Sequence, residues 1–221
     1  MVARTRGYRA AIQHEEPMIK AIIFDLGNVL LNWKPGEFLA ENGFPEPERN
    51  TILNEIFFSN EWVLLDNGDI TTEEAIEIIS LKSSLPESKI RAVFDLRLKI
   101  ITPVDSNVIL LPELKKRGFL LYYLSNFPDD IFDEVRNKYD FFRLFDGGEI
   151  SARLNMSKPD ERIFRYFLSK YSLRAEESLF IDDSEKNAGA AEKTGMKAIH
   201  LTEPSQLKPM LEQYLGSAVL S

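Results

Sequence analysis

Short apolar runs alternate with longer amphipathic segments along most of this chain. The short runs are rich in β-branched and aromatic residues, a pattern typical of buried strands, and they lie at 21–24, 119–124, 178–181 and 197–201. Apolar residues at helical spacing predict helices at 107–116, 128–139, 159–171, 184–194 and 206–215. Strands that alternate with helices predict right-handed crossovers and a parallel sheet. The expected fold class is therefore α/β, a Rossmann-like parallel sheet with helices on both faces.

Residues 37–101 interrupt this alternation, because their apolar residues recur only at helical spacings. Within this segment, Thr71 to Glu74 predicts the start of a helix, and the sequence Asp-Asn-Gly-Asp at 66–69 predicts a turn. Further along, Gly147-Gly148 is expected to break a stretch of mixed character. The helical segment directly follows the first strand, so it is expected to be an insertion into the α/β fold.

Length and composition set the domain organisation. With 221 residues and 44% hydrophobic residues, the chain is long and apolar enough for one large domain, or for one domain with a smaller inserted one. We expect a disordered extension at 1–17, an α/β core formed by 18–33 and 102–221, and a helical insertion at 34–101.

Charge and residue content exclude several classes of function. The net charge of -8 argues against a nucleic-acid or anionic-membrane partner. The chain has no cysteine, which excludes disulfides, thiolate metal sites and a cysteine nucleophile. Its two histidines, His14 and His200, lie far apart, which argues against a Ser-His-Asp triad or a histidine-rich zinc site. No apolar run approaches the ~20 residues of a membrane span, and we expect a cytoplasmic monomer or homodimer.

Polar residues follow three of the predicted strands at the point where each strand ends. They are Asp25, the pair Ser125-Asn126 and the pair Asp182-Asp183. The carboxyl ends of parallel strands share one edge of a sheet, where ligands bind. Taken alone, Asp25 fits a helix N-cap or turn acid as well as a catalytic one. Two adjacent acids are harder to explain without a cation, because like charges repel.

A lysine completes the set. Lys158 precedes Pro159, and proline is well tolerated at the first position of a helix, which leaves Lys158 outside the helix and free to point at the same edge. Asp25, Asp182 and Asp183 then form a carboxylate cluster suited to a hard cation such as Mg²⁺. Ser125 and main-chain amides near Asn126 can donate to phosphate oxygens. Such a set suits phosphoryl transfer to a carboxylate.

In these motifs the chain resembles the haloacid dehalogenase-like hydrolases, from residue 19 to about 210. The motifs stand in the order of that family: Ile-Ile-Phe-Asp-Leu-Gly-Asn-Val-Leu at 22–30, Leu-Ser-Asn at 124–126, Lys-Pro at 158–159 and Phe-Ile-Asp-Asp-Ser at 180–184. The helical insertion resembles the α-helical cap of one subfamily. The Asp-Leu-Gly-Asn sequence is similar to that of bacterial α-D-glucose-1-phosphate phosphatases. The Ser-Lys-Pro and Ile-Asp-Asp segments are similar to the phosphatase domain of soluble epoxide hydrolases.

The resemblance implies a role for each of these residues. Asp25 is the expected nucleophile, which forms an aspartyl-phosphate. Ser125 and Asn126 are expected to bind phosphate, and Lys158 to bind phosphate and offset negative charge. Asp183, helped by Asp182 and Asp25, is expected to hold Mg²⁺, together with the main-chain carbonyl of Leu26 or Gly27. The expected activity is that of a Mg²⁺-dependent phosphatase for a small phosphorylated metabolite, with a sugar 1-phosphate as one candidate.

One position departs from the family pattern. Most phosphatases of this family carry a second aspartate two residues after the nucleophile, which protonates the leaving group, and this chain has Gly27 there. An easily departing group, water or a residue of the insertion would then have to compensate. Two alternatives stay open: another hydrolase of the same fold, and a phosphate-binding regulatory protein without turnover.

The aromatic residues of the insertion are harder to assign. Aromatic residues at helical spacing usually belong to a core, and we expect this for Phe57, Phe58 and Trp62. Trp33 lies between the first motif and the insertion, so a core position and a place at the substrate entrance are equally expected for it. Asp66 is expected to be a turn residue rather than a ligand.

Overall fold

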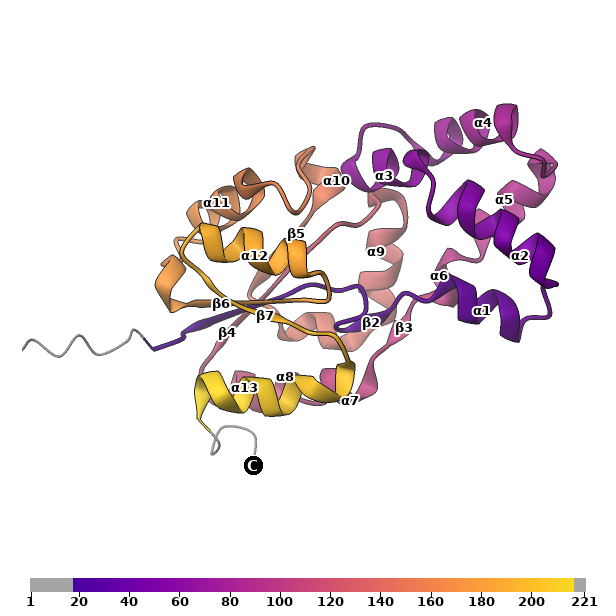
Figure 1. The fold of residues 1–221 in the computed structure, drawn as a ribbon. Coiled ribbons are helices and arrows are strands. Elements are labelled where there is room, and N and C mark those ends of the chain that lie inside the picture. The colour runs from indigo at the N-terminus through magenta and orange to yellow at the C-terminus, as the bar shows by residue number, and fades with distance from the viewer. Residues whose placement is uncertain (1–17, 217–221) are drawn as a thin grey trace, which may run out of the picture.

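The computed structural model describes residues 18–216, in which a parallel sheet carries helices on both faces and a helical insertion extends from one end (Figure 1). The five strands lie in the order β5-β4-β1-β6-β7, and every neighbouring pair is parallel. They are β1 (Ala21–Phe24), β4 (Leu120–Ser125), β5 (Gly147–Ile150), β6 (Ser178–Asp182) and β7 (Lys197–His200). The expected fold class is confirmed. The extension expected at 1–17 lies outside the described residues.

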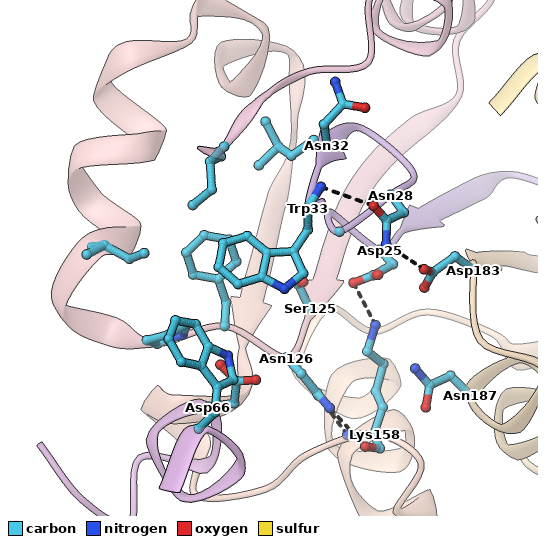
Figure 2. A pocket seen from close by; sticks show the side chains of 17 residues that line it. Asp25, Asn28, Asn32, Trp33, Asp66, Ser125, Asn126, Lys158, Asp183 and Asn187 are labelled. Atoms are coloured by element: carbon cyan, nitrogen blue, oxygen red, sulfur yellow. Dashed lines mark hydrogen bonds and ion pairs between the residues drawn. The ribbon is translucent and has the colours of Figure 1, made fainter. Parts of the chain in front are cut away.

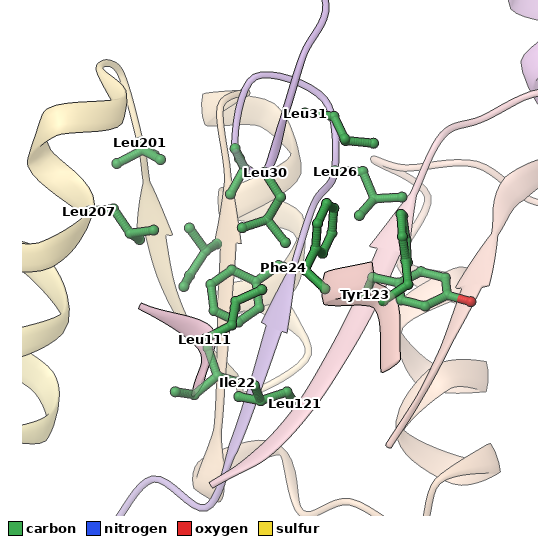
Figure 3. Close-up of a cluster of buried hydrophobic side chains, with 14 of the residues drawn as sticks. Ile22, Phe24, Leu26, Leu30, Leu31, Leu111, Leu121, Tyr123, Leu201 and Leu207 are labelled. Atoms are coloured by element: carbon green, nitrogen blue, oxygen red, sulfur yellow. The ribbon is translucent and has the colours of Figure 1, made fainter. Parts of the chain in front are cut away.

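The first strand is central because both of its faces are apolar. Ile22 and Phe24 point into one hydrophobic cluster, and Ala21 and Ile23 point into another on the opposite face. Figure 3 shows the first cluster, in which Ile22 and Phe24 lie among leucines of neighbouring elements. A shift of this strand along its neighbours would draw Lys20 or Asp25 into the apolar interior, so the position of Asp25 at its end is fixed.

Helices cover the two faces in separate groups. The first cluster is completed by α8, α9 and α13, and the second by α11 and α12. The helices of this part are α7 (Asp105–Val108), α8 (Leu111–Lys116), α9 (Asp129–Lys138), α10 (Ser151–Leu154), α11 (Glu161–Lys170), α12 (Glu185–Lys193) and α13 (Leu207–Leu215). Short 3₁₀ turns lie at Asp140–Leu144, Ala175–Glu177 and Pro204–Gln206.

The insertion between β1 and β4 is helical and has a hydrophobic cluster of its own. Its elements are α1 (Pro35–Glu41), α2 (Glu46–Ile52), a π-helical turn (Leu53–Phe57), α3 (Asn60–Asn67), α4 (Thr72–Lys82), α5 (Glu87–Asp95) and α6 (Arg97–Ile100). The predicted start at Thr71 is confirmed, since Thr71 and Glu74 cap α4 reciprocally. The insertion is joined to the rest of the chain by β2 (Leu31–Asn32) and β3 (Thr102–Pro103), which pair antiparallel.

The prediction for Gly147 and Gly148 is wrong. Both residues belong to β5, the edge strand beside β4. A Cβ added to Gly147 would lie 2.5 Å from the ring of Tyr171, and one added to Gly148 would lie 2.4 Å from the ring of Tyr123. The glycines are therefore needed so that two aromatic rings can pack against the strand, and they do not interrupt it.

None of the helices within residues 18–216 has both the length and the apolar character needed to cross a bilayer.

Candidate active site

The carboxyl ends of β1, β4 and β6 converge on one pocket, which the insertion covers from the other side (Figure 2). The pocket has a volume of about 220 Å³. The side chains predicted from the sequence that line it are Asp25, Ser125, Asn126, Lys158, Asp183 and Trp33. Asp182 is fully buried directly behind them. The structure thus brings together every residue that the sequence analysis assigned to the site.

Lys158 is buried and lies between two carboxylates. Its Nζ is 2.8 Å from Oδ1 of Asp25 and 2.6 Å from Oδ2 of Asp182. Burial alone lowers the pKa of this ammonium, but Asp182 and Asp25 outweigh it and hold the pKa above its ordinary value. Lys158 is therefore a fixed positive charge at the base of the pocket.

The main chain of Lys158 is held by Asn126. The Asn126 side chain donates to the Lys158 carbonyl at 2.9 Å and accepts from the Lys158 N–H at 2.9 Å. Asn126 therefore uses its side chain to position the lysine. The expectation for Pro159 is wrong, because α11 begins at Glu161 with Asp160 as its N-cap. Lys158 nevertheless points at the predicted edge, since Asn126 fixes the loop that carries it.

Asp25 is buried, and its pKa is raised to about 7. Burial is the main cause, and the negative charge of Asp182 adds to it. Lys158 acts in the opposite direction, as does a hydrogen bond from Ser125. Asp25 is therefore a carboxylate whose charge depends on nearby cations.

Asp25, Asp182 and Asp183 each offer an oxygen within 4.8 Å of the others. Both oxygens of Asp182 are already in use, since Oδ2 pairs with Lys158 and Oδ1 accepts from the Ser184 N–H at 2.8 Å and from Asn187 at 3.0 Å. Asp25 pairs with Lys158 through Oδ1, and Asp183 accepts from Asn28 through Oδ2. The donor set is hard and anionic, which suits Mg²⁺.

Asn28 connects this acidic group to the start of the insertion. It adopts a left-handed backbone conformation with φ of 53° in the turn after β1, a conformation that asparagine tolerates. Its side chain donates to Oδ2 of Asp183 at 2.9 Å and accepts from the main-chain N–H of Trp33 at 3.0 Å. One side chain thus orients an acid of the site and the peptide that leads into the insertion.

Two tryptophans form an apolar wall of the pocket. The rings of Trp33 and Trp62 are stacked with centroids 5.4 Å apart and planes at 29°. Trp62 and Phe57 belong to the hydrophobic cluster of the insertion, as predicted, but Trp62 also lines the pocket. The prediction for Phe58 is wrong, because its side chain is 69% exposed. Trp33 packs against two clusters and faces the pocket, so it combines the two roles that the sequence left open.

Asp66 was not predicted to belong to the site. It lies in the last turn of α3, followed by Gly68 in the left-handed conformation, and its side chain lines the pocket. The sequence Asp-Asn-Gly-Asp does mark a chain reversal, but as a helix end rather than a free turn. The signal that could have located Asp66 is its spacing of four residues from Trp62, which puts both side chains on one face of the helix.

Comparison with known proteins places these features in a family. Residues 19–195 match the family described as haloacid dehalogenase-like hydrolases. The chain is 32% identical over 197 residues to the sesquiterpene phosphatase astK of Aspergillus oryzae, an alignment that covers 89% of this chain and 97% of that protein. It is 27% identical over 203 residues to the drimenol cyclase drtB of Aspergillus calidoustus. This alignment covers 90% of this chain and 37% of the cyclase.

Among solved structures, the chain resembles the family enzyme bt-2542 of Bacteroides thetaiotaomicron in complex with magnesium and inorganic phosphate. The TM-score is 0.64 and the identity is 24%, over 82% of this chain and 93% of that one. At this identity the likeness shows a shared fold and no more.

Proposed function

Because the chain belongs to the haloacid dehalogenase-like hydrolases, we propose that it is a Mg²⁺-dependent phosphatase that transfers the phosphoryl group of a small phosphomonoester to Asp25 and then to water. The observation that carries this proposal is the buried arrangement of Lys158 between Asp25 and Asp182 at the floor of the pocket. Burying an ammonium between carboxylates costs desolvation free energy, and here the ammonium lies where a phosphate would bind.

Magnesium fits the side chains that are present. Asp25 and Asp183 would hold it, with the main-chain carbonyl of Gly27 as a further ligand. The carbonyl of Leu26 is less suitable, because it accepts the N–H groups of Leu30 and Leu31 at 2.9 and 2.8 Å. Asp182 acts through Lys158 and supports the cluster electrostatically. Magnesium, when bound, would neutralise charge on the phosphoryl oxygens and keep Asp25 ionised.

The residues of the pocket have distinct tasks in the two steps. A carboxylate oxygen of Asp25 attacks phosphorus as the bond to the leaving oxygen breaks, which gives an aspartyl-phosphate. Water then attacks phosphorus and releases inorganic phosphate and the free Asp25 carboxylate. Lys158 and Ser125 bind the phosphoryl oxygens throughout, and Lys158 offsets their negative charge. Asn126 contributes through its main-chain N–H, because its side chain is held by Lys158.

We assign the insertion, residues 34–101, the role of a cap over the core formed by 18–33 and 102–216. Its separate hydrophobic cluster, the paired strands β2 and β3 at its base and its two pocket residues Trp62 and Asp66 support this division. The cap would exclude water from the reacting phosphate and contact the leaving group.

The leaving group that fits the pocket best is apolar. The stacked rings of Trp33 and Trp62 form one wall, and Ile101, Phe127 and Ile131 complete it. The similarity to a sesquiterpene phosphatase agrees with a terpenoid or other prenyl monophosphate as substrate. The volume of about 220 Å³ is below the ~300–1000 Å³ of typical ligand sites, so we expect short prenyl chains to be accommodated best.

A sugar 1-phosphate is the second candidate. Asn32 and Asp66 also line the pocket, and both can hydrogen-bond to sugar hydroxyls. A sugar has several hydroxyl groups, however, and the stacked indole rings offer no hydrogen-bond acceptor to those that face them. We therefore rank this substrate class below the apolar one.

Phosphate release from a panel of phosphomonoesters, with and without Mg²⁺, tests the function. The panel contains dimethylallyl, geranyl and farnesyl phosphates, glucose 1-phosphate and p-nitrophenyl phosphate. We expect Mg²⁺-dependent turnover that Asp25→Asn abolishes and that Asp69→Asn, which changes an exposed acid, leaves intact. A phosphoryl group trapped on the wild-type chain and absent from Asp25→Asn would identify the intermediate. Equal inertness of wild type and Asp25→Asn on every ester would refute the proposed function.

A further inference from the structure

We propose that Asp66, contributed by the insertion, protonates the leaving oxygen and then accepts a proton from the attacking water. This inference rests on the proposed phosphatase function. It assigns the acid–base role to a residue more than forty positions from the nucleophile in the sequence.

The residues that line the pocket limit which group can act as the acid and base. The titratable side chains that line it within the described chain are Asp25, Asp66, Lys158 and Asp183. Asp25 is the proposed nucleophile, Lys158 is an ammonium held between two carboxylates, and Asp183 accepts from Asn28 beside the proposed metal. Gly27, two residues after the nucleophile, has no side chain to offer. Asp66 is the remaining group that can exchange a proton.

The carboxyl group of Asp66 is available for this task. Among residues 18–216 its side chain makes no hydrogen bond or ion pair. Figure 2 shows it pointing into the pocket from the side of the insertion, with Trp33 beside it and Asp25 on the opposite side. A leaving group bound between the phosphate and the tryptophans would therefore pass between Asp25 and Asp66.

Several contacts hold the end of α3 that carries Asp66 against the core. The hydroxyl of Ser151, which is fully buried, donates to the main-chain carbonyl of Asp66. The same hydroxyl accepts from the N–H of Phe127, in the loop that follows Ser125 and Asn126. One side chain thus ties the turn that carries Asp66 to the loop proposed to bind phosphate.

Gly68 permits this close approach. Its φ is 76°, and a Cβ at this position would lie 2.3 Å from the carbonyl oxygen of Ala152. Asn155, at the end of α10, adds hydrogen bonds to the carbonyls of Asn67 and Gly68 at 3.4 and 3.2 Å. A helix end held at three successive residues positions its side chains, so Asp66 has the fixed placement that acid–base catalysis needs.

The electrostatic surroundings also suit proton exchange. Burial raises the pKa of Asp66 to about 7, and the negative charge of Asp25 contributes in the same direction. The cations nearest to α3 are paired with other acids: Lys82 of α4 with Glu61, and Arg153 of α10 with Asp129 and Asp133. On α4, Glu73 pairs with Arg91 and Glu74 caps the helix at Thr71, and Glu77 is exposed. Glu55 of the π-helical turn accepts from Ser83. With a pKa of about 7, Asp66 can both give up and accept a proton near neutral pH, as acid–base catalysis requires.

Asp66 gives up one proton in the first step and regains one in the second. As Asp25 attacks phosphorus and the bond to the leaving oxygen breaks, the Asp66 carboxyl gives its proton to that oxygen, and an alcohol departs. The Asp66 carboxylate then takes a proton from water as the water oxygen attacks the aspartyl-phosphate. Inorganic phosphate and protonated Asp66 result, and the cycle can begin again.

Leaving-group dependence tests this role. For Asp66→Asn we expect kcat/KM on an alkyl phosphate to fall about 10²- to 10³-fold, because the alkoxide then departs without a proton. On p-nitrophenyl phosphate, whose leaving group is stable as an anion, kcat/KM should fall less than about 10-fold. A burst of p-nitrophenolate should precede slow turnover, because hydrolysis of the aspartyl-phosphate loses its base. Asp69→Asn is the matched control and should show neither effect.

A second variant, Gly27→Asp, places an acid two residues after the nucleophile. A Cβ at Gly27 would contact only Oδ2 of Asp25, at the ordinary distance of 3.7 Å, so Gly27→Asp can be accommodated. In the double variant with Asp66→Asn, it should recover at least about 10-fold of the lost kcat/KM on the alkyl phosphate. Parallel losses on both ester types, or no loss at all, would overturn the role of Asp66 while leaving Asp25 as nucleophile. An inactive wild type would instead remove the proposed function and this inference together.

Discussion

The ammonium of Lys158 lies 2.8 Å from Oδ1 of Asp25, a contact between residues 133 positions apart in the sequence. It is buried, and it separates Asp25 from Asp182. Removing the charge with Lys158→Met leaves two buried carboxylates facing each other. We expect the free energy of unfolding to fall by about 3–5 kcal/mol, measured by urea denaturation without metal. Phosphatase activity should fall at least about 100-fold.

The same variant reports on the metal. A divalent cation at Asp25 and Asp183 offsets part of the repulsion that Lys158→Met creates. Mg²⁺ should therefore raise the melting temperature of Lys158→Met by more than it raises that of wild type. An equal response of both proteins would argue against a metal at these carboxylates.

Asn28 is expected to tune the affinity for Mg²⁺. Asn28→Gly keeps the left-handed backbone conformation but removes the hydrogen bonds to Asp183 and to the N–H of Trp33. The Mg²⁺ concentration needed for half-maximal activity should rise about 10- to 100-fold, as for other residues that orient metal ligands. Ser172→Gly, at an exposed position with a similar φ of 54°, is the control and should not change it. An unchanged requirement in Asn28→Gly would mean that Asp183 is held in place without Asn28.

Trp33 is expected to determine the preference for apolar leaving groups. Trp33→Ala removes the ring that stacks on Trp62 but keeps the main-chain N–H that binds Asn28. We expect kcat/KM for geranyl phosphate to fall about 10- to 100-fold, since loss of a buried aromatic contact costs about 1.5–3 kcal/mol. Inhibition by inorganic phosphate, which the ring does not contact, should stay the same. Trp33→Phe should recover much of the loss, and an equal loss on glucose 1-phosphate would contradict an apolar subsite.

We expect Asp66 to lower the free energy of unfolding as the pH rises. Its pKa is about 7 in the folded protein against an ordinary value of 3.8, so the folded state binds more protons than the unfolded state between these two values. Stability therefore decreases through this window and is lowest, for this group, above pH 7. Asp66→Asn should raise the free energy of unfolding at about pH 8 by roughly 2 kcal/mol and change little near pH 4.

Urea denaturation at the two pH values, without metal, measures this difference, and Asp69→Asn should show none. A gain in stability that accompanies a loss of activity would also exclude misfolding as the reason for the loss. If Asp66→Asn were less stable than wild type at pH 8, the carboxylate would have a structural partner and the assignment would be wrong.

Local sequence patterns were sufficient for most of the fold. Four of the five sheet strands are predicted by short apolar runs of β-branched or aromatic residues, three of which end in polar residues. The edge strand β5 was missed, since Gly147 and Gly148 carry no such signal. Their presence in a strand depends on the rings of Tyr123 and Tyr171, and these contacts form only in the folded chain.

Some residues of the candidate site could also be predicted from the sequence, and others could not. Asp25, Ser125 and Asp182 could be grouped in advance, because parallel strands bring their carboxyl ends to one edge. Asp66 could not, since its place in the pocket depends on Ser151, 85 residues away, and on the fit of Gly68 against Ala152. In the sequence, these contacts between distant segments are indicated only by Gly68 and by the four-residue spacing of Trp62 and Asp66.

The pairing of β2 with β3 has a consequence for how this protein can evolve. Because Leu31–Asn32 and Thr102–Pro103 lie side by side, the two ends of the insertion meet at one point of the core. A segment with adjacent ends can be lengthened or exchanged at little entropic cost, since doubling a flexible loop costs only about 0.6 kcal/mol. The insertion can therefore be grafted or replaced while the sheet keeps its acids and lysine in place. New substrates are then accessible by changing the insertion, provided that the exchanged segment again brings a proton-carrying side chain to the position of Asp66.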